Sequence, residues 1–255
     1  MADRSLSAMT SDTVERVPPA ALRPRTAPRA AGPRSVRARR HWTWLAGGTV
    51  LSFLVPFVLA DQLQLQRDLY YGIYGLAVVG LFTGWATDTG QSLREMCARR
   101  WRIALALGLA FAGISVLIVL GSEDATSRPG GLEFIAAIVW RGLIYGGIDG
   151  VLLSAFPIMV VFSAFTGSRL RLHRAGVFAV GAIALAASMA MTATYHLGYA
   201  DFRSEKVRKP VSGDLVWSVP TLATLNPVGA PIAHVGLHVG AVAHSYDTDL
   251  FLPPH

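Results

Sequence analysis

Long apolar runs constrain the fold of this chain more than any other feature of its sequence. Several stretches hold about 18 or more residues with few charges, and roughly 20 apolar residues let a helix cross the hydrocarbon core of a bilayer. Only 15% of the 255 residues are charged, whereas a soluble domain usually has about 25%. The sequence therefore predicts an all-α fold, a polytopic transmembrane helix bundle, and argues against an ordinary soluble domain.

We expect about six spans. Four of them are helices of ordinary length, at residues 43–60, 69–86, 103–121 and 175–197. Aromatic side chains are common at the membrane–water interfaces. Tyr70, Tyr71 and Trp85, near the ends of the second span, are therefore expected in such aromatic belts.

The apolar run at residues 132–165 is too long for one simple span. As a single helix it would be about 50 Å long, whereas the hydrocarbon core is ~30 Å thick. We therefore expect one crossing plus a broken or re-entrant segment near 132–150, with the break at Gly146-Gly147 or at Pro157. Two full spans in this run, which would make seven in all, are the alternative.

The last apolar run, residues 215–245, is interrupted by proline and glycine. The interrupting residues are Pro220, Pro227, Gly229 and Pro231. They predict a re-entrant or broken segment near 215–230, followed by a helix at 230–245. Irregular backbone at membrane depth is tolerated only where it is buried in protein or lines a cavity. We therefore expect this segment to lie inside the bundle.

The two ends of the chain differ in composition from the middle. Residues 1–40 contain nine arginines and five prolines without apolar periodicity, which predicts a disordered cytoplasmic tail. Residues 41–245 form the predicted transmembrane helical domain, and residues 246–255 form a short C-terminal tail. The single cysteine, Cys97, excludes an intramolecular disulfide.

Basic residues predict the orientation of the chain. Arginines gather in the tail and in the loops after the second and fourth spans, and the positive-inside rule makes that side cytoplasmic. With six spans, both termini lie in the cytoplasm of a multi-pass cell-membrane protein, and the Arg-rich composition suggests a bacterial source. The tail is expected to attract anionic lipid headgroups. No nucleic-acid partner is expected, because no aromatic residues alternate with its arginines.

The segment "WRGLIYGGIDG" places polar and small residues on two stripes of one helix. Arg141, Tyr145 and Asp149 recur every four residues and predict a polar ladder on one face. The second stripe lets a neighbouring helix approach closely: Gly142, Gly146 and Gly150. We interpret the ladder as a buried contact between helices. Alternatively, Arg141 reaches the interface and Asp149 caps a half-helix.

Histidines point to a metal site. His234 and His238 lie four residues apart on one helix face, and Gly236 and Gly240 form a packing surface on the opposite face. Such a histidine pair can bind one metal ion, and zinc needs three or four ligands. His196 is the candidate third ligand, and Asn226 could add an oxygen ligand. His244 is instead assigned to the cytoplasmic boundary, near Asp247 and Asp249. As an alternative to a metal site, His196 and His234 could ligate haem between two helices.

Two motifs resemble the membrane family of CAAX proteases and bacteriocin-processing (CPBP) enzymes. "AAIVWRGLIYG" (136–146) resembles the family's first motif, and "APIAHVGLHVGAV" (230–242) is similar to its last, with Tyr195-His196 in the place of the middle histidine. The resemblance implies a metal-dependent intramembrane protease with Arg141, His196 and His234 as site residues. Alanines occupy the places of its two glutamates, and His238 stands where Asn or Asp is expected. The general base is then unassigned, with Glu133 and Asp149 as candidates.

Three classes of function fit these features. The first is a structural or accessory membrane protein with a polar, histidine-containing intramembrane site. The second is a metal-dependent intramembrane hydrolase that uses zinc on His196, His234 and His238. The third is transport of a small solute or proton along broken helices. Substrate and oligomeric state stay open, and convergence of the three imidazoles would favour the hydrolase.

Overall fold

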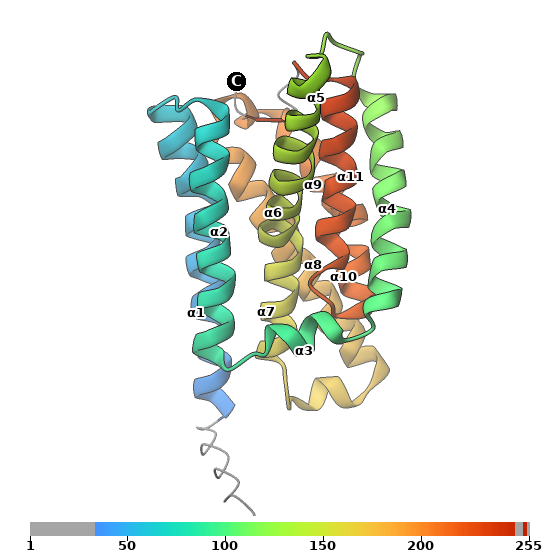
Figure 1. Ribbon diagram of the computed structural model, residues 1–255. Helices are drawn as coiled ribbons and strands as arrows, with labels where there is room; N and C mark the ends of the chain where they lie inside the picture. Colours follow the sequence, from blue (N-terminus) through green and yellow to red (C-terminus); the bar gives the residue numbers. More distant parts are fainter. Residues whose placement is uncertain (1–33, 248–251, 254–255) are drawn as a thin grey trace, which may run out of the picture. The chain divides into compact units, whose positions relative to one another are not determined.

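The computed structural model describes residues 34–247 and 252–253, and every regular element in these ranges is helical. The first half of the bundle contains α1 (Arg34–Val55), which continues as a π-helix over Pro56–Gln62, then α2 (Arg67–Thr89), the short α3 (Leu93–Ala98) and α4 (Trp101–Ser122). The second half contains α5 (Gly131–Ala137), α6 (Gly146–Gly150), α7 (Phe156–Ala164), α8 (Arg174–Leu197), α9 (Arg208–Trp217), α10 (Val219–Thr224) and α11 (Gly229–His244). The predicted all-α bundle is confirmed (Figure 1).

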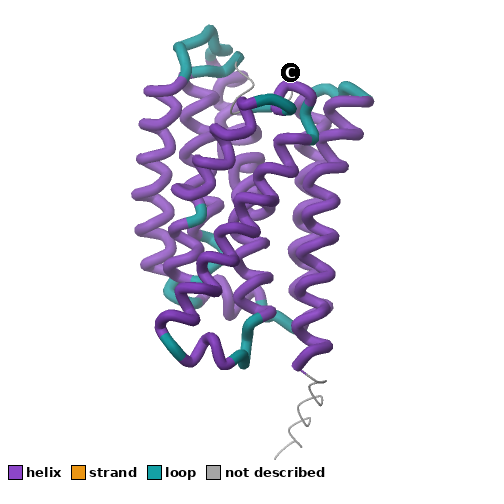
Figure 2. The backbone as a smooth tube through the Cα atoms, turned by 180° about the vertical axis from the view of Figure 1, so that it is seen from behind, coloured by secondary structure: helices purple, strands orange, loops and turns teal. Residues whose placement is uncertain are grey.

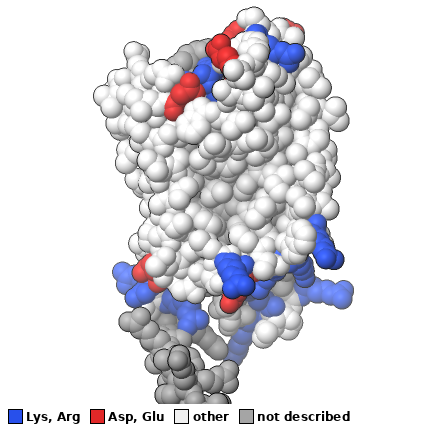
Figure 3. Space-filling view, in the orientation of Figure 1, with Lys and Arg blue, Asp and Glu red and all other residues white. Residues whose placement is uncertain are grey.

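Five helical stretches are long and apolar enough to cross a membrane: Val36–Gln62, Arg67–Thr89, Trp101–Ser122, Gly131–Ala164 and Arg174–Leu197. They run side by side, and most loops lie at the two ends of the bundle (Figure 2). On the face shown in Figure 3, charged side chains gather at the two ends and leave the middle bare, with lysine and arginine concentrated at the end where α3 lies. This distribution is consistent with a multi-pass membrane protein.

The long run at 131–164 does not break into two pieces. Ile138–Tyr145 and Val151–Ala155 form π-helical turns that join α5, α6 and α7 into one continuous helix. The predicted break at Gly146-Gly147 or Pro157 is wrong, since both positions are α-helical and the π-helical turns lie beside them. The backbone continues through these widened turns because i→i+5 hydrogen bonds keep it paired. This helix is the centre of the bundle, since 72% of its most apolar window is buried.

The segment after α8 passes along the bundle instead of lying in an external loop. Short helices α9 and α10 run from the end that contains residues 198–207 to the opposite end, and α11 returns (Figure 1). At the turn before α11, Asn226 Nδ2 donates to the carbonyl oxygens of Cys97 and Arg99 at 2.8 and 2.6 Å. At the far end of α11, His244 Nε2 donates to the carbonyl oxygen of Glu123 at 3.0 Å.

The described chain passes along the bundle seven times, and the short helices at 208–224 make one of these passes. An odd number of passes places the start of α1 and the end of α11 at opposite ends of the bundle. Near the start of α1, Trp44 donates to Asp88 at the end of α2 at 2.9 Å, which places these two helix ends together. His244 therefore lies at the end of α11 that contacts Glu123, away from the arginine loop at residues 94–102, while the termini themselves lie outside the described residues.

The predicted tails lie partly outside the described residues. Helix α1 begins at Arg34, inside the predicted 1–40 tail, because arginine is a good helix former and extends the apolar helix outward. At the other end of the chain, Leu252 is fully buried and packs with Trp217 and Leu237. The described part of the C-terminal segment thus belongs to the bundle, next to α9 and α11.

Candidate functional site

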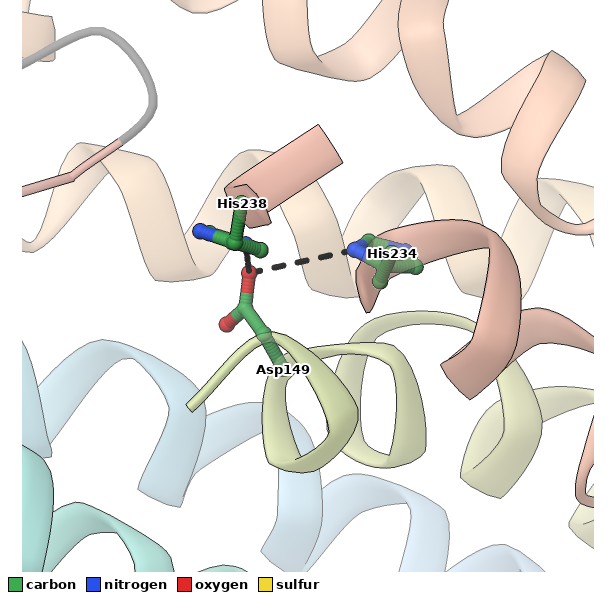
Figure 4. Close-up of side chains that lie close together, drawn as sticks. All are labelled: Asp149, His234 and His238. Atoms are coloured by element: carbon green, nitrogen blue, oxygen red, sulfur yellow. Dashed lines mark ion pairs between the residues drawn. The ribbon is translucent and has the colours of Figure 1, made fainter. Parts of the chain in front are cut away.

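Asp149, His234 and His238 come together in the middle of the bundle (Figure 4). Asp149 lies on α6, and both histidines lie on α11. Asp149 Oδ2 is 3.3 Å from His238 Nε2 and 4.0 Å from His234 Nδ1. One ligand atom from each residue lies within 4.8 Å of the others, and all three side chains are buried. The sequence thus brings two imidazoles and one carboxylate to a single buried point.

The glycine stripe explains why α11 approaches α6 so closely. A Cβ atom on Gly150 would lie 2.6 Å from the Cα atom of Pro231, and one on Gly146 would lie 2.9 Å from Cδ2 of His238. Since both distances are below van der Waals contact, only glycine allows this approach. Gly142 continues the contact against Val239. The stripe therefore brings the Asp149 backbone against the histidine face.

Three imidazole nitrogens in the site have no hydrogen-bond partner among the described residues: Nδ1 of His234, and Nδ1 and Nε2 of His238. His238 Nε2 lies close to the Asp149 carboxylate, but the two are not aligned as a hydrogen bond. The other carboxylate oxygen, Oδ1, accepts from the hydroxyl of Tyr74 at 2.8 Å. Buried polar atoms are normally paired, so this group has unused donor and acceptor capacity.

A small cavity adjoins the three residues. It has a volume of about 20 Å³, enough for one water molecule or one metal ion. Its other lining residues include Tyr145, Leu153, Tyr195, His196, Trp217 and Leu237. His196 and His234 both line it, and its volume is much smaller than that of a porphyrin.

His196 does not join the three-residue group in the structure. Its Nδ1 donates to the carbonyl oxygen of Thr192 at 2.8 Å, and its ring packs against Phe202 at 4.9 Å between centroids. His196 therefore contributes to the cavity wall. Asp149 occupies the place beside the two α11 histidines where the sequence predicts His196. The choice between these two residues depends on which helices are neighbours.

Arg141 makes its side-chain hydrogen bonds to residues other than Tyr145 and Asp149, its partners in the predicted ladder. Its guanidinium donates to both carboxylate oxygens of Asp68 at 2.9 Å and to the hydroxyl of Tyr246 at 2.7 Å. The arginine lies within the π-helical turn Ile138–Tyr145, and its long side chain reaches residues of α2 and of the C-terminal segment. The arginine fastens α2 and the C-terminal segment to the central helix.

The remaining sequence candidates lie outside the site. Glu133 is exposed in α5 and is not a lining residue of the cavity. Asn226 holds the turn before α11 against the α3 region, as described above, and has no role as a ligand there. Gly236 and Gly240 face α4, where a Cβ on Gly236 would fall 2.5 Å from the Cα atom of Ala112. These glycines let α11 pack closely against α4 on the side of the helix that points away from Asp149.

Tyrosines form a layer beside the site that sequence reasoning missed. The hydroxyl of Tyr145 is 2.8 Å from that of Tyr195, which accepts from Tyr199 at 2.7 Å; Tyr199 in turn lies 2.6 Å from Tyr70. Tyr70, Tyr71 and Trp85, expected near the membrane interfaces, are all buried inside the bundle. The close spacing of Tyr70, Tyr71 and Tyr74 on α2 was the signal for a tyrosine-rich interior face.

Comparison of the chain with protein-family models, curated proteins and solved structures gives no match. The resemblance to the CPBP family therefore stays a prediction. The fold and the site define a multi-pass helical bundle with a buried group of one carboxylate and two imidazoles. Any statement about function has to be argued from that group.

Proposed function

We propose that this protein is an integral membrane metalloprotein that binds one divalent transition-metal ion, such as zinc, through Asp149, His234 and His238. The observation that supports the proposal best is the convergence of three ligand atoms within 4.8 Å in a buried site. Imidazole nitrogen and carboxylate oxygen are both common zinc ligands, at about 2.0–2.2 Å from the ion. The unpartnered nitrogens of both histidines supply the lone pairs that such an ion requires.

The charges of the core also favour a divalent cation. Asp149 and Asp214 are the buried carboxylates of the described residues, and no described lysine or arginine is buried with them. Burying an ionised carboxylate without a compensating charge is strongly unfavourable. One divalent ion balances two carboxylates and leaves the histidines neutral, which is the form in which they act as ligands.

Three protein ligands leave one position open in a tetrahedral zinc site, as in catalytic zinc centres. The adjoining cavity has room for the water molecule that would occupy it. This arrangement favours a metal-dependent intramembrane hydrolase as the second, more specific candidate, because a bound metal ion activates water for attack on a carbonyl group. The CPBP resemblance implies the same class of chemistry, although with His196 rather than Asp149 in the ligand set.

A structural or accessory role and a transport role stay as alternatives. A metal that stabilises the bundle without hydrolytic activity would favour the accessory role. Metal-dependent flux of protons or small solutes in liposomes would favour transport.

The metal site is tested with the full-length protein purified in detergent. Elemental analysis should find one zinc per chain after loading and removal of free metal, and His234→Ala, His238→Ala and Asp149→Ala should each lower the metal content. The matched control is His244→Ala, which removes a histidine from the same helix outside the site. His196→Ala should keep its zinc. Zinc absent from the wild type, or retained by a His234→Ala/His238→Ala double variant, would rule the proposal out.

A further inference from the structure

A second buried carboxylate lies behind the candidate metal site. Asp214 on α9 is completely buried, and its Oδ1 accepts hydrogen bonds from Ser154 at 2.8 Å and Ser218 at 3.0 Å. Its Oδ2 has no hydrogen-bond partner among the described residues. An acidic side chain in the interior of a helix bundle needs a reason, since such groups are costly there and usually functional.

Ser154 connects this carboxylate to a candidate ligand. Its hydroxyl oxygen is 3.2 Å from Nε2 of His234 and 2.8 Å from Oδ1 of Asp214. A serine hydroxyl has one proton to donate, and here it donates that proton to Asp214. Ser154 must therefore accept from His234, which requires a proton on Nε2 and leaves Nδ1 as the unprotonated nitrogen.

That tautomer is the one the metal site needs. His234 Nδ1 is the nitrogen that faces Asp149, at 4.0 Å from Oδ2, and it has no other partner in the described structure. Histidines that bind metals usually donate the proton of their other ring nitrogen to a carboxylate, a carbonyl or water, which fixes the ring and raises its basicity. Trp217, also on α9, lies against the same imidazole at 5.0 Å between ring centroids.

We propose that Ser154 and Asp214 form a positioning arm for the metal ligand His234. Asp214 holds the Ser154 hydroxyl, Ser154 accepts the Nε2 proton of His234, and Nδ1 is thereby directed at the ion. Asp214 also supplies the second negative charge that balances a divalent cation, which makes a divalent ion the preferred occupant over a monovalent one. This inference rests on the proposed metal site.

Ser188 provides a matched control inside the same polar cluster. Its hydroxyl donates to the carbonyl oxygen of Leu153 at 2.8 Å and lies 2.9 Å from that of Ser218. It is as buried as Ser154, but it has no hydrogen bond to His234. Ser188→Ala and Ser154→Ala therefore remove the same chemical group from the same buried cluster, and only the second removes the hydrogen bond to His234.

The experiment measures zinc affinity by competition with a chelating dye, together with the visible absorption spectrum of the Co²⁺-loaded protein, for full-length variants in detergent. Ser154→Ala should weaken zinc binding by about 10- to 100-fold and shift the Co²⁺ bands, as loss of an outer hydrogen bond does in other zinc sites. Ser154→Thr, which keeps the hydroxyl, should restore both, and Ser188→Ala should leave both unchanged. Asp214→Asn removes the charge with little change of shape and should weaken zinc binding in the same way.

The possible outcomes distinguish failure of the positioning arm (Ser154 and Asp214) from failure of the metal site itself. If zinc binds to the wild type and is lost in His234→Ala, but Ser154→Ala and Asp214→Asn retain wild-type affinity and spectra, the arm is wrong and the metal site stands. An equal loss of affinity in Ser188→Ala would also overturn the arm, because the effect would then come from general loosening of the cluster. Should Ser154→Ala not fold, Asp214→Asn and Ser154→Thr decide the question. A wild type that binds no zinc overturns both proposals.

Discussion

Replacing Gly150 with alanine should damage both the packing of the bundle and the candidate metal site. The new methyl group would lie 2.6 Å from the Cα atom of Pro231 and 3.0 Å from Cβ of His234. Carbon atoms in contact are at their optimum at about 3.5–4.0 Å, so α11 has to move away by roughly 1 Å. The atom in the way belongs to the backbone of α11, and no side-chain rotation relieves the clash.

The size of the effect follows from the cost of overpacking. Adding a methyl group to a filled core costs about 1–3 kcal/mol of unfolding free energy. For a chain of this length, 1 kcal/mol corresponds to a melting-temperature change of about 2–4 °C, which gives a decrease of roughly 2–12 °C relative to an alanine placed in the same helix without the clash. The same displacement moves His234 away from Asp149 and should lower metal affinity.

Gly147→Ala is the matched control, because the nearest atom to its methyl group is Cγ2 of Val235 at 3.8 Å, an ordinary contact. Both substitutions gain the same helix propensity, about 1 kcal/mol in favour of alanine. Thermal unfolding in detergent and zinc titration of the two variants give the comparison. Equal melting temperatures and equal zinc affinities would refute the reasoning, since the close approach of α11 to α6 would then have no energetic consequence.

Three further predictions follow from the described contacts. Arg141→Lys should lower the melting temperature, measured by thermal unfolding, because a single ammonium cannot make the two-pronged hydrogen bond to Asp68; a variant as stable as the wild type would contradict this. Tyr74→Phe should weaken zinc binding without removing the ion, since it deletes the hydroxyl that donates to Asp149, and unchanged affinity would argue against that role. Partial burial raises the pKa of the Cys97 thiol, so labelling by a membrane-impermeant maleimide should be slow at neutral pH and accelerate at higher pH than for a free cysteine. Labelling of inverted vesicles but not of intact cells would confirm the predicted cytoplasmic position of this end, and the reverse pattern would contradict it.

Much of the bundle could be predicted from the apolar runs, and the site only in part. The four-residue spacing of His234 and His238 and the glycine stripe around Asp149 are local features, so helical periodicity was enough to recognise them. The third member of the group was not local. His196 and Asp149 lie on different helices, and only the packing of α6 against α11 decides which of them meets the histidine pair.

The polarity of α9 explains why the sequence placed residues 198–214 in an external loop. Residues 198–214 contain acidic and basic residues in near balance, which is typical of an external loop. Inside the bundle, however, Asp214 is surrounded by serine hydroxyls that donate to it, so the usual objection to burying a carboxylate is partly met. Hydropathy counts this residue as polar and cannot register partners that come from other helices.

The burial of Asp214 and the composition of the site are therefore linked. A helix as polar as α9 gains little from burial by itself, yet its Asp214 and Trp217 both lie beside His234 or the serine bound to it. Without a cation, the described core would hold two carboxylates and no buried arginine or lysine. With a divalent ion between Asp149 and the two histidines, the same arrangement becomes electrically balanced, and each polar group of α9 that approaches His234 has a role. Removal of the metal should thus lower the melting temperature of the wild type more than it lowers that of the Asp214→Asn variant. The variant has already lost one of the two negative charges that the ion offsets.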